Sequence, residues 1–189
     1  AALATRENII GGIREILDRY AVDGIHFDDY FPPLGAESHN ALLRDVYSTV
    51  HSYGKVFGVS PSGNISNNLA NGVDVRTWLS SAGYVDYICP QIYWTDNYGS
   101  SGTETMFSDR LQAWKAMDTA GIPMYIGLAL YRSGSSNTSD PGWVMSQSNL
   151  SGMLQKLRAA GCGGFVLYSY SAMLSPGSSA ELNNFLAAL

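Results

Sequence analysis

Residues 22–30 read VDGIHFDDY, and the fold can be predicted outward from this stretch. A short apolar run ends there in two adjacent carboxylates, a pattern typical of a strand with a polar carboxyl end. Apolar residues at helical spacing precede the stretch in residues 9–20 and follow it in residues 42–50. The local order is therefore helix, strand, helix.

The same alternation of strand and helix continues to the C-terminus. Strand-like runs lie near residues 22–29, 55–60, 85–93, 123–131 and 164–170, and helical repeats lie in 74–81, 107–117, 150–157 and 178–189. Ser38 is expected to cap the helix at 42–50, and Ser178 and Glu181 to form a capping box at the last helix. Strict alternation predicts an α/β fold with parallel strands and crossover helices. Two architectures fit, a doubly wound sheet and a (βα) barrel. The first strand is not followed by GxGxxG and no GxxxxGK[ST] is present, which argues against nucleotide folds.

Composition excludes several classes of function. The 189 residues are 46% hydrophobic and 14% charged, with a net charge of −5, as in a globular domain with one sizeable core. A mildly acidic chain lacks the basic patch that duplex DNA or an anionic membrane requires. No apolar run approaches the roughly 20 residues of a membrane span, and residues 1–20 form an amphipathic helix instead of a signal peptide. Cys89 and Cys162 are interpreted as buried structural thiols, although their positions also leave a disulfide open.

Candidate functional residues gather at the carboxyl ends of the predicted strands, where both architectures hold their ligands. Strand alternation places His26, Asp28 and Tyr30 on one face. Asp28 and Asp29 can perform general acid–base catalysis, although Asp29 could equally cap a loop or pair with an arginine. His26 is interpreted as a residue that orients a carboxylate. The candidates for substrate binding in this part of the chain are His26, Tyr30, Ser60 and Asn64.

A second group of candidates follows the later strands. Gln91 and Tyr93 share a face, and their amide and hydroxyl groups suit hydrogen bonds to the hydroxyl or acetamido groups of a sugar. Trp94 and Tyr168 could stack on a pyranose ring or pack among other aromatic residues. Arg132 could pair with Asp28, bind an anionic substrate group, or be a solvated loop residue. Too few His, Cys and acidic residues lie at ligand spacing to predict a metal site, and no cofactor is expected.

Two long blocks resemble a known family. Residues 22–32, VDGIHFDDYFP, resemble the central strand of the bacterial glycosyl-hydrolase-like family ten domain, and residues 85–94, VDYICPQIYW, resemble its second block. Residues 60–61, 125–132 and 168–171 fit its later strands in order. The resemblance implies a TIM-barrel glycoside hydrolase of the bacterial cell envelope, secreted or extracytoplasmic, whose signal peptide lies outside this chain. It also implies a polysaccharide partner, peptidoglycan glycan strands.

A fainter similarity extends to chitinases. Asp23, Gly24 and Asp28 match the chitinase pattern Asp-Gly-x-Asp-x-Asp-x-Glu, but His26 and Tyr30 stand where that pattern has acids. Tyr30 occupies the position of the chitinase catalytic acid. Residues 91–94 are similar to the chitinase Met-x-Tyr-Asp block, and Tyr93 matches the tyrosine that holds the substrate acetamide.

The leading hypothesis is therefore hydrolysis of a β-linked N-acetylhexosamine polymer. Asp29 is the expected general acid and base, Asp28 orients an acetamido nucleophile, and Tyr93 and Gln91 hold the acetamide. A second version keeps Asp28 as one of two standard carboxylates and takes the other from elsewhere in the barrel. The alternative from another class is a catalytically inactive glycan-binding barrel module. An aldolase or isomerase lacks support, because no lysine ends a strand and no phosphate-binding glycine pattern follows the last strands.

The number of strands defines the expected domain. A complete barrel has eight strands and about 250 residues, whereas five strands are predicted here. In the resembled family the Asp28 strand is the fourth, so residues 1–189 are expected to be strands 4 to 8 of a single catalytic barrel domain. Strands 1 to 3 are then expected from an N-terminal segment, another chain or self-association, because parallel strand edges would otherwise be exposed.

Overall fold

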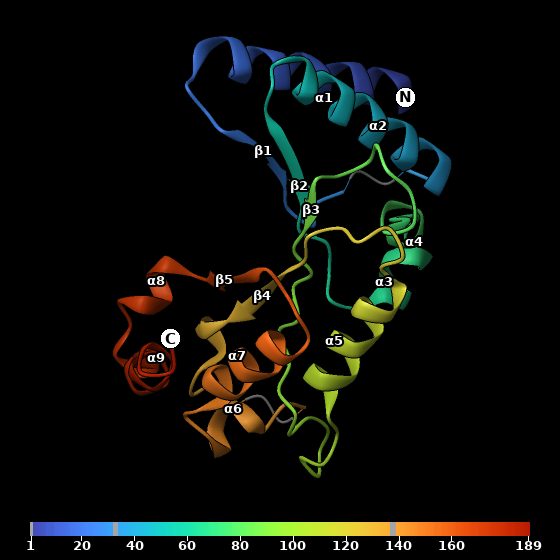
Figure 1. Ribbon diagram of the computed structural model, residues 1–189. Coiled ribbons are helices and arrows are strands. Elements are labelled where there is room, and N and C mark those ends of the chain that lie inside the picture. The colour runs from blue at the N-terminus through green and yellow to red at the C-terminus, as the bar shows by residue number, and fades with distance from the viewer. Residues whose placement is uncertain (1, 32–33, 137–138) are drawn as a thin grey trace. The chain divides into compact units, whose positions relative to one another are not determined.

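A computed structural model describes residues 2–31, 34–136 and 139–189 of the chain (Figure 1). Pro32 of the first block lies outside the described residues. The helices and strands follow the order α1 (Ala2–Arg19), β1 (Gly24–Phe27), α2 (Ala36–Ser52), β2 (Val56–Val59), α3 (Ile65–Ala70), α4 (Val75–Trp78), β3 (Tyr87–Ile88), α5 (Met106–Met117), β4 (Tyr125–Ala129), η1 (Leu130–Arg132), α6 (Gly142–Met145), α7 (Asn149–Ala159), β5 (Gly164–Tyr168), α8 (Tyr170–Met173), η2 (Pro176–Ser178) and α9 (Ser179–Leu186). Each of the five predicted strands is confirmed, with shorter bounds than predicted.

The chain forms two compact units. The first contains Ala1–Cys89 and Met117–Pro123, and the second contains Pro90–Ala116 and Met124–Leu189. Within the described residues, no helix is both long and apolar enough to cross a bilayer.

In the first unit, β1, β2 and β3 form a parallel sheet in that order. Helices α1 and α2 run side by side along this part of the chain (Figure 1). Helix α2 turns a fully buried apolar face inward, made of Leu42, Leu43, Val46 and Val50. Phe57 of β2 is also fully buried, and the Phe27 ring meets its edge at 5.1 Å. The helical spacing seen in the sequence is thus the spacing of this core face.

In the second unit, β4 and β5 are parallel neighbours, with Tyr125 opposite Gly164 and Ala129 opposite Tyr168. Gln91 adds a parallel bridge to Gly127 of β4. Helices α7 and α9 pack together near these strands (Figure 1). The core of this unit is formed by residues that are almost completely buried, including Trp114, Trp143, Leu150, Leu154, Leu157 and Phe185.

Two predicted helix caps are wrong, because other groups satisfy the helix ends. Helix α2 begins at Ala36 with Gly35 at its N-cap, so Ser38 lies inside the helix. Ser178 precedes α9, but its hydroxyl donates to the backbone oxygens of Ala172 and Ser175. Glu181 is fully buried and accepts the Leu150 N–H at 2.6 Å, which satisfies the start of α7 instead of its own helix.

Both cysteines are free thiols, so the disulfide alternative is wrong. Cys89 is buried, as predicted, and burial raises the pKa of its thiol to about 11. Cys162 is only half-buried, and burial raises its pKa as well.

Candidate functional site

A histidine–tyrosine pair spans the three-stranded sheet of the first unit. His26 of β1 lies opposite Gly58 of β2, and Gly58 lies opposite Tyr87 of β3. The Tyr87 hydroxyl oxygen is 2.9 Å from His26 Nδ1, and the two rings are stacked at 5.7 Å. A Cβ atom at position 58 would meet three Tyr87 ring atoms within 2.3 Å. Glycine at this position therefore leaves the space through which Tyr87 reaches His26.

Asp28 follows His26 at the carboxyl end of β1. Its Oδ1 accepts the backbone N–H of Asp29 at 2.8 Å. Asp28, His26 and Tyr30 line one cavity of about 220 Å³, whose remaining walls are the apolar side chains of Ile9, Phe27, Phe31 and Leu42. Burial lowers the pKa of His26, and the nearby charge of Asp28 opposes this shift. A lowered pKa favours neutral imidazole at neutral pH, which suits a hydrogen-bonding role beside Asp28.

Asp29 lines a different cavity, of about 230 Å³, together with Asn67 and Asn71. Burial raises the pKa of Asp29, and the neighbouring charge of Asp28 raises it further. A carboxyl group with a raised pKa keeps its proton to higher pH, as a general acid requires. The two adjacent aspartates therefore differ in surroundings, since they line different cavities.

The other candidates in the first unit have different surroundings. Tyr30 is 88% exposed and is one of the residues that line the Asp28 cavity. The Ser60 hydroxyl is buried and donates to the backbone oxygen of Cys89 at 2.9 Å. Asn64 is the N-cap of α3, where its side chain accepts the Asn67 N–H at 3.1 Å. Ser60 therefore ties the end of β2 to the backbone that follows β3, and Asn64 stabilises the start of α3.

The second unit holds a cluster of three tyrosines. Tyr93 stacks on Tyr168 at 6.1 Å, and Tyr131 meets both rings edge-on at 5.8 and 5.6 Å. Arg132 Nε donates to the Tyr131 hydroxyl at 3.1 Å. Gln91 pairs with Gly127, the middle residue of the neighbouring strand β4. The cluster presents both aromatic faces and hydroxyl groups, a combination that suits a sugar ring.

Trp94 stands apart from the tyrosine cluster in its contacts. The Arg110 guanidinium of α5 lies 3.7 Å from the centre of the Trp94 ring, in a cation–π contact. Arg110 therefore occupies one face of the indole, and a stacked sugar would have only the second face. Arg110 Nη1 is buried and has no hydrogen-bond partner among the described residues.

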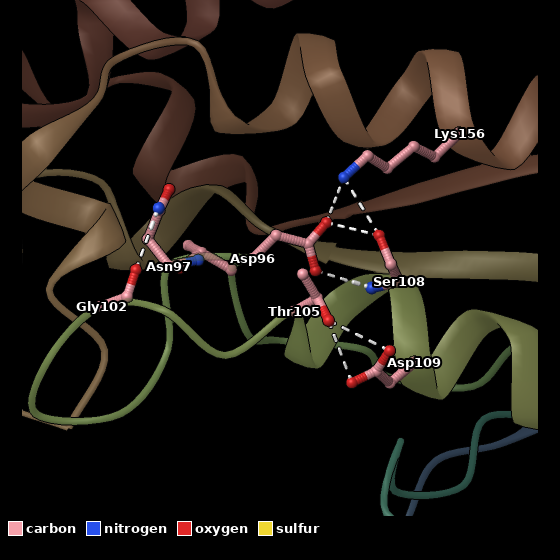
Figure 2. A network of polar contacts seen from close by, with 8 residues as sticks. Asp96, Asn97, Gly102, Thr105, Ser108, Asp109 and Lys156 are labelled. Atoms are coloured by element: carbon pink, nitrogen blue, oxygen red, sulfur yellow. Dashed lines mark hydrogen bonds and ion pairs between the residues drawn. The ribbon is translucent and has the colours of Figure 1, made fainter.

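Polar contacts fix the segment that follows Trp94 (Figure 2). Asp96 accepts the Ser108 N–H at 2.8 Å and also binds the Lys156 ammonium group, which joins the segment to α5 and α7. Burial alone would raise the pKa of Asp96, but the hydrogen bonds from Lys156 and Ser108 outweigh it and hold the pKa below its ordinary value. The fully buried Asp140 binds Thr95 in a similar way. Both carboxylates accept hydrogen bonds from backbone and side-chain groups of the second unit, which gives them a structural role.

Two residues of the histidine–tyrosine pair and the tyrosine cluster were not predicted from the sequence. Tyr87 and Tyr131 were not among the candidates, although one precedes Gln91 on its strand and the other precedes Arg132. The sequence shows Tyr87 at an alternate position of its strand and Tyr131 at the end of its strand, and either position could have indicated a functional residue. Their partners are distant in sequence, because Tyr87 bonds His26 and Tyr131 contacts Tyr168. Within the described ranges, no three His, Cys, Asp or Glu side chains gather as metal ligands would.

The family described as Glycosyl hydrolase-like 10 matches residues 37–145, more than half of the sequence, and the chain belongs to this family. The chain is 29% identical to Glycosyl hydrolase YngK of Bacillus subtilis (strain 168), over 73% of this chain and 35% of that protein. It is 28% identical to Glycosyl hydrolase DigH of Escherichia coli (strain K12), over 71% of this chain and 39% of that protein. The chain thus spans little more than a third of the length of these relatives.

Solved structures with a similar fold are chitinases. A chitinase from Chromobacterium violaceum ATCC 12472 superposes with a TM-score of 0.67 at 13% identity, over 98% of this chain and 73% of that chain. The catalytic domain 2 of an Ostrinia furnacalis Group II chitinase gives a TM-score of 0.64 at 10% identity, over 97% of this chain and 72% of that chain. At such identities the likeness concerns the fold. It decides between the two predicted architectures in favour of the (βα) TIM barrel.

Proposed function

We propose that the chain belongs to a glycoside hydrolase that cleaves β-linked N-acetylhexosamine polysaccharides, with peptidoglycan glycan strands as the substrate. The observation that carries the proposal is the pair of adjacent carboxylates at the end of β1. Asp28 lies beside the His26–Tyr87 pair, and Asp29 has a raised pKa. Membership of a glycosyl hydrolase-like family and the chitinase-type fold support it.

The proposed reaction is substrate-assisted hydrolysis. Asp29 donates its proton to the glycosidic oxygen as the bond to the anomeric carbon breaks, and the acetamido carbonyl oxygen bonds to that carbon. Asp28 accepts the acetamide N–H and stabilises the positive charge of the ring that forms. Water then adds to the anomeric carbon as the bond from that carbon to the acetamido oxygen breaks. The water gives its proton to the Asp29 carboxylate, which restores the enzyme. The chitinase similarity assigns Tyr93 to the acetamide, and the side-chain amide of Gln91 suits the same group; both assignments rest on the sequence.

Paired amide substitutions test the two roles. Loss of a positioned general acid lowers the rate by about 10²–10⁴-fold, so Asp29→Asn is expected to lose that much on a natural glycan. A 4-nitrophenyl leaving group needs no protonation, and it is expected to restore most of the activity of Asp29→Asn but not that of Asp28→Asn. Asp109→Asn, at an exposed position of α5, is the matched control. Equal losses for Asp29→Asn on both substrates would contradict the acid role.

A second candidate function is a glycan-binding barrel without catalysis. The Tyr93, Tyr131 and Tyr168 cluster favours it, because an aromatic platform binds sugars without any acid. Incubation with purified glycan strands separates the two functions. New reducing ends support the hydrolase, whereas sedimentation with the strands and no new reducing ends supports the binding module.

We further propose that the barrel is completed by strands outside this chain, supplied by an N-terminal segment, another chain or self-association. Among the described residues, β1 pairs with β2 alone and β5 pairs with β4 alone. Val166 and Tyr168 of β5 are 51% and 53% exposed, which is unusual for apolar residues of a parallel strand. Light scattering tests self-association directly. We also propose an extracytoplasmic location, where peptidoglycan is found. Fractionation of the source cells tests it.

A further inference from the structure

An amide-rich cavity lies between β1 and α3 in the first unit. Its volume is about 230 Å³, and Asp29, Ser62, Asn67 and Asn71 line it with polar groups. A whole small-molecule site occupies about 300–1,000 Å³, so this cavity has room for one sugar ring of a longer chain. The cavity that Asp28 lines is a neighbouring one, since Phe31 lines both.

The two asparagines leave complementary hydrogen-bonding groups in this cavity. Asn71 Nδ2 donates to the backbone oxygen of Asn67 at 2.8 Å and to Asn67 Oδ1 at 3.2 Å. Each amide keeps one further group, the Asn67 Nδ2 donor and the Asn71 Oδ1 acceptor, with no partner in the part of the chain that the structure describes. Both residues are exposed, and the Asn64 cap fixes the backbone of Asn67 through its N–H.

The lining of the cavity also includes apolar side chains. Phe31 and the buried Val73 line it, and Phe31 is itself held by the Trp78 ring at 5.5 Å. A donor, an acceptor and an apolar surface in one cavity match an acetamido group, which has one N–H, one carbonyl oxygen and one methyl group. Plain sugar hydroxyls would satisfy the two asparagines but would leave Phe31 and Val73 without an apolar partner.

We propose that this cavity is a subsite for one N-acetylated sugar ring of the glycan, with its acetamido group between the asparagines and Phe31. Asn67 Nδ2 donates to the acetamido carbonyl, and Asn71 Oδ1 accepts the acetamido N–H. The adjacent position of Asp29 links the subsite to the reacting bond. This inference deepens the proposed function and rests on it, because it adds recognition of a second acetamido sugar beside the one that reacts.

Binding of chitotetraose and cellotetraose to the full chain tests the proposal by isothermal titration calorimetry. The double variant Asn67→Ala/Asn71→Ala is expected to bind chitotetraose about tenfold more weakly, which corresponds to about 1.4 kcal/mol. The exposed Asn8→Ala in α1 is the matched control and is expected to bind as wild type. Asn67→Asp keeps the acceptor for Asn71 but removes the donor, so it tests the same bond without shortening the side chain. Cellotetraose, which lacks acetamido groups, is expected to bind each protein weakly and equally.

Side-chain amide NMR signals locate the ligand independently of these variants. N-Acetylglucosamine is expected to shift the Asn67 and Asn71 signals and leave that of Asn8 unchanged. If the wild type binds and cleaves chitotetraose while the variants bind it equally well, the subsite is wrong and the proposed hydrolase stands. If the two signals shift but no glycan is cleaved, the subsite stands and the hydrolase is wrong. If no protein binds chitotetraose and no signal shifts, both are wrong.

Discussion

The substitution Gly58→Ala is the sharpest test of how the first unit is built. The Cβ atom that it adds would lie 2.0 Å from one Tyr87 ring atom and 2.3 Å from two others. Carbon atoms in contact lie about 3.5–4.0 Å apart, so the ring has to move by roughly 1.5 Å. Gly58 is buried within a parallel sheet, paired with His26 on one side and Tyr87 on the other. The backbone is therefore held on both sides, and the Tyr87 ring has to yield.

The cost follows from two effects. Overpacking of a well-packed core costs about 1–3 kcal/mol. A displaced Tyr87 ring also loses the 2.9 Å hydrogen bond to His26, worth about 0.5–1.5 kcal/mol. We therefore expect Gly58→Ala to lower the free energy of unfolding by about 2–4 kcal/mol. Under the proposed function it also lowers activity, because His26 beside Asp28 loses its partner.

Urea unfolding of a double-mutant cycle measures this effect. In a Tyr87→Ala background the ring is absent, so Gly58→Ala is expected to cost less than about 1 kcal/mol there. Gly152→Ala in α7 is the matched control, because a Cβ at that helical position meets nothing within 4 Å, and a gain of about 0.5–1 kcal/mol is expected. A Gly58→Ala chain within 0.5 kcal/mol of wild type, or an equal cost with and without the Tyr87 ring, would refute the reasoning.

Three further predictions concern buried ionisable groups. Burial raises the pKa of Glu181, although the hydrogen bonds from Leu150 and Asn149 oppose this shift, so the stability that Glu181 contributes is fully present below pH 4.5 and is lost as pH rises through the raised pKa. Glu181→Gln should therefore flatten the pH dependence of the free energy of unfolding. Glu181→Ala should lower that free energy by about 1–3 kcal/mol in urea unfolding, because it leaves the Leu150 N–H unpaired. For Asp96 the pH dependence of stability runs the opposite way, because its pKa is lowered: the stabilisation is present above pH 3.8 and is lost as pH falls through the lowered pKa. Asp96→Asn should therefore destabilise the chain at pH 7 much more than at pH 2. Equal destabilisation at the two pH values would contradict this prediction. Cys89, with a pKa raised to about 11, should resist thiol reagents at pH 8 until the chain is unfolded, and rapid labelling of the native thiol would show that it is not buried.

Local sequence patterns predicted the elements well and the contacts between them poorly. The five strands and the apolar faces of α2, α5 and α7 follow from periodicity, because a residue's side of a strand or helix depends only on its own position. The predicted helix caps were wrong, because the hydrogen-bond partner of a capping side chain depends on contacts between distant parts of the chain. Glu181 has the spacing of a capping box, but the N–H that it accepts belongs to Leu150, 31 residues away.

The candidate site divides in the same way. The adjacency of Asp28 and Asp29 at a strand end was visible in the sequence, and so was the expectation that His26 lies on the same face as Asp28. The hydrogen bond from Tyr87 to His26 was not visible, because it depends on strand register and on the space at Gly58. The contact of Arg110 with Trp94 was equally hidden, since it joins a loop to the face of a helix.

By itself, the sequence determined the order of parallel strands and crossover helices, the pair of carboxylates and the family, since each depends on residues close together in the chain. The tertiary structure alone decided the surroundings of each group. It placed Asp28 and Asp29 on separate cavities and raised the pKa of Asp29, because burial depends on every segment that packs nearby. It also brought Asn67 and Asn71 to the side of Asp29 across about forty residues of chain.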